Sequence, residues 1–167
     1  YVSGRGRTGE PASTGLALLR RDGFASMDAG DAPGKLTTRP VVFHGRHLFV
    51  NVDCPAGLLR AEMLDRDGQV IAPFTKDNCK PLCVDRTLQR VEWNNADDLS
   101  ALAGKPVRFR FHLDNGRLYS FWVSPDTSGA SGGYVAAGGP GYTTPRDDVG
   151  QAAYDAVKPM VRGTIAP

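Results

Sequence analysis

Between residues 15 and 123, turn residues divide the chain into segments no longer than ordinary β-strands. Dipeptides typical of tight turns recur there, among them Asp22-Gly23 and Asn115-Gly116. Residues 47–53 alternate strictly between two faces, the pattern of a strand with one buried side. Apart from one helical turn predicted at residues 99–102, the chain from residue 15 to 123 is predicted to consist of short strands and turns. The chain is therefore predicted to be all-β, a two-sheet β-sandwich of jelly-roll type.

The composition after residue 124 changes, and so does the expected structure. Residues 1–14 have no period and are predicted to be a flexible arm or the remnant of a preceding domain. Residues 15–124 are the predicted β-sandwich module. Residues 125–167 are predicted to form an irregular arm rich in Gly, Ser and Pro, with a short helix at 148–158. The chain opens without Met or a signal pattern, so we expect a processed product or a piece of a longer protein.

Charge and hydrophobicity exclude two kinds of partner. Lys and Arg number 20 against 18 Asp and Glu, a net charge of +2, so no strong field of one sign would attract nucleic acid or anionic lipid. No stretch approaches the roughly 18–20 apolar residues of a membrane span. We therefore expect neither a nucleic-acid nor a membrane partner.

The clearest turn lies between residues 107–113 and 118–123, which are predicted to pair as a hairpin around Asn115-Gly116. In that register the two faces of the hairpin differ in chemistry. The face predicted to enter the core carries Val107, Phe109, Phe111, Leu113, Leu118 and Trp122. The opposite face carries Arg108, Arg110, His112, Tyr119 and Phe121.

This mixed basic and aromatic face is the first candidate ligand site. Sugar rings stack their C–H patches on aromatic side chains, while charged and amide groups bond their hydroxyls. Trp93, beside Asn94 and Asn95 at a strand end, is a second candidate. The alternatives are that the arm covers Tyr119 and Phe121, or that Arg and aromatic side chains stack as ordinary scaffolding.

Catalytic and metal-binding candidates are weaker. Glu62 and Glu92 could form the carboxylate pair of a glycoside hydrolase, but each alternates with Arg along a strand, as in cross-strand ion pairs. Asp28, Asp31 and Asp53 could hold a structural calcium ion, although Asp is also common in turns. No other cofactor is expected.

The three cysteines leave two alternatives open. Cys54 could form a disulfide with Cys79 or Cys83, which suits a secreted or extracytoplasmic protein, or all three could be reduced.

Several segments resemble the C-terminal region of bacterial proteins related to glycoside hydrolase family 32. They include Arg-Arg-Asp-Gly-Phe-Ala-Ser-Met at residues 20–27 and Gly-Arg-Leu-Tyr-Ser-Phe-Trp at 116–122, together with residues 36–40, 47–52 and 98–107. In that family a five-bladed β-propeller carries the catalytic carboxylates, and a β-sandwich module follows it. The resemblance covers about three quarters of the chain but not the propeller motifs. It therefore implies a carbohydrate context without supplying a catalytic residue.

These observations favour a noncatalytic accessory module of a carbohydrate-active protein. Such a module would bind a polysaccharide or oligosaccharide, or brace a catalytic propeller domain. The first alternative is a small stand-alone glycoside hydrolase that uses a carboxylate pair. The second is a structural oligomerisation domain whose exposed face contacts a second copy of the chain.

Overall fold

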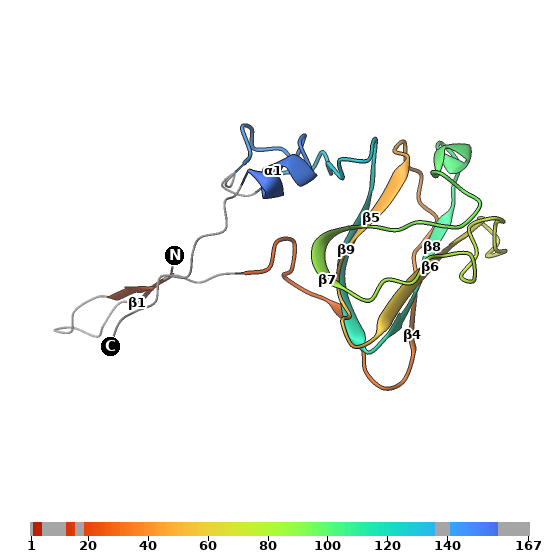
Figure 1. Ribbon diagram of the computed structural model, residues 1–167, viewed down its shortest axis with the longest axis horizontal. Helices are drawn as coiled ribbons and strands as arrows, with labels where there is room; N and C mark the ends of the chain where they lie inside the picture. Colours follow the sequence, from red (N-terminus) through yellow and green to blue (C-terminus); the bar gives the residue numbers. More distant parts are fainter. Residues whose placement is uncertain (1, 5–12, 16–18, 136–140, 157–167) are drawn as a thin grey trace.

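The computed structural model describes residues 2–4, 13–15, 19–135 and 141–156. Its strands are β1 (Val2–Gly4), β2 (Ser13–Gly15), β3 (Met27–Ala29), β4 (Gly34–Thr37), β5 (His47–Asp53), β6 (Leu58–Leu64), β7 (Asp85–Arg90), β8 (Arg108–Asp114) and β9 (Gly116–Ser124). The helical elements are a 3₁₀ turn, η1 (Ser100–Leu102), and α1 (Gln151–Asp155). β1 and β2 pair with each other, and β3 to β9 form two antiparallel sheets that face one another (Figure 1).

The strand order within the two sheets is that of a jelly roll. The larger sheet has the order β3-β9-β5-β7 and the smaller one β4-β8-β6, so each strand from β4 to β9 lies in the sheet opposite to the strand before it. Beyond β6, an irregular segment takes the place of a fourth strand. The Met63 amide donates to the Phe74 carbonyl at 2.9 Å, and Leu59 and Leu82 exchange two backbone bonds. The predicted all-β two-sheet sandwich is confirmed.

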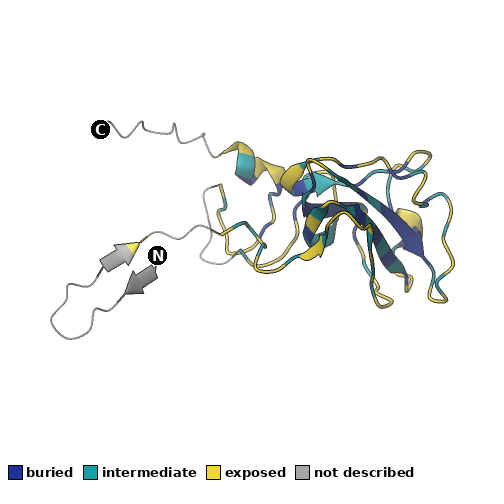
Figure 2. Cartoon of the chain, turned by 90° about the horizontal axis from the view of Figure 1, so that it is seen from below, coloured by how far each residue is buried: buried dark blue, intermediate teal, exposed yellow. Residues whose placement is uncertain are grey.

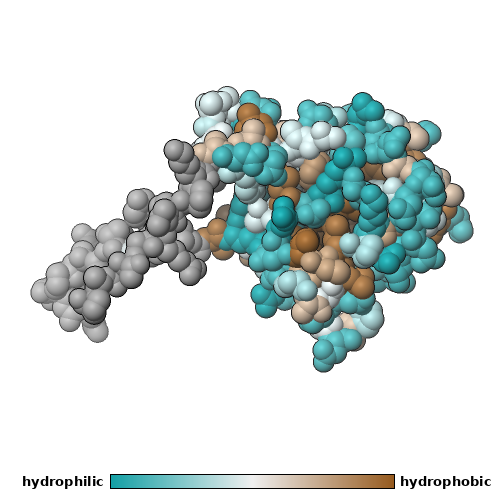
Figure 3. Space-filling model, in the orientation of Figure 1, coloured by the Kyte–Doolittle hydropathy of each residue, from teal (hydrophilic) through white to brown (hydrophobic). Residues whose placement is uncertain are grey.

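The core lies between the two sheets and follows from alternation along the strands. On β8, Phe109, Phe111 and Leu113 are buried, while Arg108, Arg110 and His112 between them are only partly covered. On β5, the residues that enter the core are Leu48, Val50 and Val52. Figure 2 shows the buried positions concentrated along these strands. In the view of Figure 3, hydrophobic side chains gather over the space between the sheets and hydrophilic ones surround them.

The predicted hairpin at Asn115-Gly116 is wrong. β8 pairs with β4 and β6 in the smaller sheet, whereas β9 pairs with β3 and β5 in the larger one. The turn at Asn115 (φ 41°) therefore carries the chain from one sheet to the other. The rings of Phe109 and Phe111 on β8 lie 5.3 and 5.0 Å from that of Phe121 on β9. Folding the two strands face to face buries the apolar side of both, which a flat hairpin would leave open.

A register shift in β9 also changes which of its side chains point inward. The shift lies opposite Asn51 and Val52 of β5. Because of it, Leu118 and Phe121 both pack against the core although they are three residues apart. Trp122 lies on the other side, where its ring stacks on Phe49 at 5.9 Å. The predicted inward Trp122 and outward Phe121 are therefore both wrong.

The segments that flank the sandwich lie on the outer side of the larger sheet. Residues 19–24, here called the strap, and α1 are both found on the side of β5 and β9 that faces away from the smaller sheet (Figure 1). The name C-terminal arm is used here for residues 125–135 and 141–156. The arm is irregular apart from α1, which is shorter than the helix predicted at 148–158; residues 157 and 158 lie outside the described part.

All three cysteines are free. Cys54 and Cys79 are buried, and burial raises the pKa of both thiols. The Cys54 thiol donates to the Leu82 carbonyl at 3.2 Å, and the Cys79 sulfur accepts from the Ala61 amide at 3.2 Å. Cys83 is exposed. Of the two alternatives left open by the sequence, the structure has the three reduced cysteines.

The arch between β8 and β9 depends on a close approach at Gly57. A Cβ atom at Gly57 would lie 1.9 Å from the Asp114 carbonyl oxygen and 2.4 Å from that of Asn115. Gly57→Ala is therefore expected to lower the free energy of unfolding by about 3 kcal/mol. Urea denaturation would measure the loss. Gly30→Ala is the control, because nothing lies within 4 Å of its added Cβ. Equal stability of the two variants would contradict the close approach of Gly57 to the arch.

Candidate functional site

The outer face of the larger sheet is covered rather than open to solvent. Phe49 and Asn51 of β5 point away from the core, yet they are 2% and 0% exposed. Leu88 of β7 is also buried, because the arm passes directly over it. At Gly129 an added Cβ would lie 2.9 Å from both Leu88 and Phe49. The Trp122 indole donates to the Gly129 carbonyl at 2.9 Å and fixes the start of the arm on the sheet.

Arg20 anchors the strap to the same face. Its guanidinium donates to the Asn51 side chain at 2.6 Å, to the Val52 carbonyl at 3.0 Å and to Asp85 at 2.5 Å. The guanidinium also lies 4.7 Å from the centre of the Tyr119 ring. Asn51 completes the connection by donating to the Arg21 carbonyl. The oxygen and the nitrogen of the buried Asn51 amide thus each have a partner in the strap.

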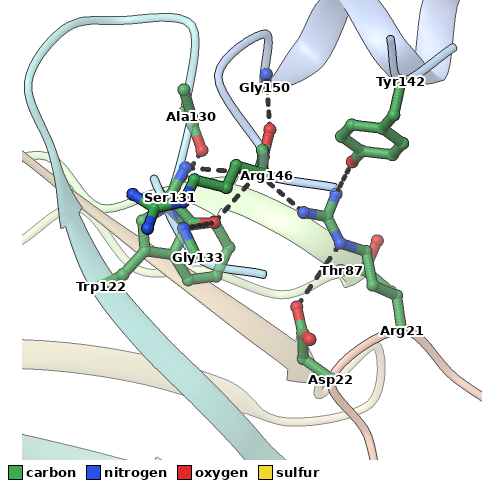
Figure 4. Close-up of polar contacts among 12 residues, drawn as sticks. Arg21, Asp22, Thr87, Trp122, Ala130, Ser131, Gly133, Tyr142, Arg146 and Gly150 are labelled. Carbon is green, nitrogen blue, oxygen red and sulfur yellow. Dashed lines mark hydrogen bonds and ion pairs between the residues drawn. The ribbon is translucent and has the colours of Figure 1, made fainter. Parts of the chain in front are cut away.

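Arg21 joins the strap to the C-terminal arm. Its guanidinium donates to Asp147 at 2.7 Å and to the hydroxyls of Tyr142 and Tyr154, and it lies over both tyrosine rings. Figure 4 shows Arg21 directed at Tyr142, with Ser131 and Gly133 of the arm close by. Tyr154 also bonds the Thr87 hydroxyl at 2.9 Å, which ties α1 to β7. This cluster holds strap, arm and sheet together.

Asp147 is the central acceptor of this cluster and is wholly buried. Its carboxylate accepts from Arg21, from the amide and hydroxyl of Ser131, and from the Gly150 amide at 2.8 Å. Burial acts to raise the pKa of Asp147, but the bonds from Gly150, Arg21 and Ser131 outweigh it and lower the pKa. Burial also raises the pKa of the Tyr142 hydroxyl, to about 12.

Between the strap and the arm lies a groove of about 700 Å³. Its aromatic lining is Phe24 of the strap, Trp122 of β9, and Tyr134 and Tyr142 of the arm. We call it the aromatic groove. The side chains that line it are Leu19, Arg20, Arg21, Asp22, Phe24, Ser120, Trp122, Ser131, Tyr134, Val135 and Tyr142.

Two of the aromatic side chains in the groove are largely uncovered. Phe24 is 86% exposed and Tyr134 is 75% exposed. Arg146 lies 4.9 Å over one face of the Tyr134 ring. The Ser120 hydroxyl also lines the groove, and it is buried without a hydrogen-bond partner among the described residues. Flat apolar surfaces beside free polar groups suit a ligand with both apolar and hydroxyl faces.

The residues predicted for the first ligand site are divided between the two sheets. Arg108, Arg110 and His112 lie on the outer face of the smaller sheet. Tyr119 lies on the larger sheet beneath Arg20, and Phe121 packs against the core. The predicted single face of five residues is therefore wrong, because it depended on the hairpin.

The second candidate, Trp93, is placed in the core. It is 6% exposed, its indole donates to the Ala61 carbonyl at 3.1 Å, and its ring meets Phe74 edge-on. In this position Trp93 offers no ring face to a ligand.

The two candidate catalytic glutamates do not share a cleft. Glu62 is 7% exposed and accepts from Arg110 and His112, both at 3.0 Å. Burial acts to raise the pKa of Glu62, but these two bonds hold it below its usual value. Glu92 instead pairs with Lys80 and Arg90 at 3.5 and 3.7 Å. Both carboxylates thus take part in the ion pairs that the alternation with Arg indicated.

Two of the three candidate calcium ligands lie near one another. Asp28 and Asp53 line one hollow together with Arg117, and Asp31 does not line it. Asp28 lies 3.7 Å from the Arg117 guanidinium. In the described part of the chain, no group of three or more His, Cys, Asp or Glu side chains could hold a metal ion. Structural calcium stays a prediction without a complete ligand set.

Sequence reasoning missed the groove residues Arg21, Phe24, Tyr134 and Tyr142, and also Asp147, which holds Arg21 in place. Tyr134 and Tyr142 did stand out as isolated aromatics in a segment rich in Gly and Pro. Aromatic residues without strand neighbours need some other surface to pack on, and that was the available signal. Nothing in the spacing of Arg21 and Asp147, 126 residues apart, indicates their pairing.

Compared with models of protein families, with curated proteins and with solved structures, the chain matches none of them. Among the described residues, no helix has the length and apolar character needed to cross a membrane.

Asp147→Asn is expected to lower the free energy of unfolding by about 3 kcal/mol, because it removes the buried counter-charge of Arg21 and leaves Arg21 with the exposed Asp22. The pKa of Asp147 is lowered in the folded chain, so its contribution is complete above the ordinary Asp pKa of about 3.9. That contribution is lost as the pH falls through the lower folded value. Chemical denaturation between pH 2 and 7 measures this dependence, which the variant should lack. Asp148→Asn, at an exposed neighbouring residue, is the control. An equal effect of both variants on stability would contradict the role of Asp147 in holding the cluster together.

Proposed function

We propose that the chain is a noncatalytic accessory module of a carbohydrate-active protein, and that its aromatic groove binds a polysaccharide or oligosaccharide. The observation that carries the proposal is the exposure of Phe24 and Tyr134 on facing segments of the groove. Folding usually buries such rings. Two rings held open on opposite segments offer the stacking surfaces that sugar rings use.

The polar groups of the groove complement these rings. The Arg20 and Arg21 guanidiniums are fully engaged by the protein and therefore form a fixed wall. Ser131 also lines the groove, and its hydroxyl is held in place by Asp147 and by the Gly133 amide. Groups already fixed before binding lose little entropy when a ligand arrives.

The described geometry favours binding over hydrolysis. Glycoside hydrolases need two carboxyl groups about 5–10 Å apart on one cleft. Among the residues that line the aromatic groove, Asp22 is the acidic one. Glu62 and Glu92 are occupied by cationic partners elsewhere in the sandwich. The resemblance to modules that follow a catalytic propeller supports the same assignment, and such a setting would place the chain outside the cytoplasm.

Retention on a panel of insoluble and gel-embedded polysaccharides tests the proposal. We expect retention by the unaltered chain without new reducing ends in the supernatant. Phe24→Ala and Tyr134→Ala should each weaken binding roughly tenfold, since a well-placed aromatic anchor contributes about 1.4 kcal/mol or more. Val42→Ala, at an exposed apolar residue outside the groove, should leave binding unchanged.

Other outcomes point to the alternatives. New reducing ends that persist in Phe24→Ala would favour a hydrolase with its site elsewhere. Absence of retention on every polysaccharide, together with sedimentation that depends on protein concentration, would favour an oligomerisation domain. In that case Phe24→Ala should shift the chain toward the monomer.

A further inference from the structure

The outer face of the smaller sheet carries a second chemistry, one that is cationic and without aromatic side chains. β4, β6 and β8 point Lys35, Arg60, Arg108, Arg110 and His112 away from the core. The register places Lys35 and Arg60 directly opposite His112, on its two sides. We call these five residues the cationic face. A near-neutral total charge of +2 conceals this local excess.

Most of the positive charge on this face is not neutralised by the protein. Glu62 is paired with Arg110 and His112. The other acidic residue at an outward position of these strands, Asp114, lies at the end of β8 opposite Leu58. Lys35, Arg60 and Arg108 have no carboxylate within ion-pair distance in the described part of the chain.

The two unpaired guanidiniums are nevertheless held in place. Arg60 donates to the carbonyls of Lys76 and Cys79, the latter at 3.0 Å, and Arg108 donates to those of Arg66 and Thr38. Carbonyl acceptors fix the position of a guanidinium without cancelling its charge. The sheet thus holds cations at fixed positions. Neighbours along a strand lie about 7 Å apart, and those across strands lie about 5 Å apart.

We propose that the cationic face binds the carboxylate or sulfate groups of an acidic polysaccharide. Lys35 and Arg60 lie on the two sides of His112 in the register, so an acidic polymer laid across this row would contact both cations. Guanidinium groups match the two oxygens of carboxylates and sulfates. A linear polymer with repeating anions fits a flat grid of cations.

Nucleic acid fits this face less well. Single strands are usually bound by stacking bases on aromatic side chains, and the outward positions of β4, β6 and β8 carry none. Duplex recognition uses an element that enters a groove, which a flat sheet face does not supply. The choice of a polysaccharide rests in part on the proposed carbohydrate function of the aromatic groove.

Affinity electrophoresis and titration with polygalacturonate, dextran sulfate, neutral dextran and single-stranded DNA test the proposal. Lys35→Glu should weaken binding to polygalacturonate or dextran sulfate at least about tenfold. Lys35 is exposed and makes no side-chain hydrogen bond in the described chain, so the change should not impair folding. Arg86→Glu is the matched control, because it makes the same charge change at an exposed site on β7 of the larger sheet. Binding should also fall as salt rises from 0.05 to 0.5 M.

Three results would overturn the proposal. The first is no binding to either acidic polymer at low salt. The second is an equal loss from Lys35→Glu and Arg86→Glu, which would indicate only total charge. The third is tighter binding of DNA than of both acidic polymers. Phe24→Ala should leave acidic-polymer binding intact, so failure of the groove and failure of the cationic face are distinguishable.

Discussion

A fully buried carboxylate, Asp147, and its partner Arg21 hold together two segments that are 126 residues apart in the chain. Neither segment has a strand of its own with which to join the sandwich. The ion pair, the two tyrosine hydroxyls and the amides around Asp147 satisfy each other, so the buried charge is tolerated. Without this cluster, the strap would keep its bonds to the larger sheet through Arg20 and Asn51, and the arm would keep its bond from Trp122. The two segments would no longer be joined to each other, and the walls of the aromatic groove would separate.

As a result, the two outer faces of the sandwich differ in exposure and in chemistry. The larger sheet is covered, and its outward Phe49 and Asn51 are buried as completely as the core. The smaller sheet is left uncovered by the strap and the arm, and it shows the alternation of buried apolar and partly exposed charged residues expected of a half-solvated antiparallel sheet. Among the described residues, the exposed rings of Phe24 and Tyr134 thus lie on the side of the larger sheet, and the cationic face lies on the smaller one. Neutral and acidic carbohydrate would therefore contact opposite faces.

The architecture could be predicted because it depends on local signals. Strand-length alternation and frequent turns sufficed for an all-β sandwich, and the alternation within β8 correctly separated Phe109 and Phe111 from Arg108 and Arg110. The pairing of β8 with β9 could not be predicted, because Asn115-Gly116 permits an arch between sheets as well as a hairpin within one. The bulge opposite Asn51 then reversed the sides of Phe121 and Trp122. The aromatic groove could not be predicted for a different reason. Its walls come from segments without periodicity, and they are joined by a contact between residues far apart in the sequence.

The central claim is that the ligand lies in the aromatic groove, which Trp122 lines, and the two tryptophans allow a direct test. Trp93→Phe leaves Trp122 as the single tryptophan, and Trp122→Phe leaves Trp93, which is buried in the core. Acrylamide quenching of each variant, with and without a polysaccharide that retains the chain, reports which indole the ligand covers. We predict that the polysaccharide protects Trp122 from acrylamide and leaves the quenching of Trp93 unchanged. Unchanged quenching of Trp122 in the presence of bound polysaccharide would contradict the assignment of the aromatic groove.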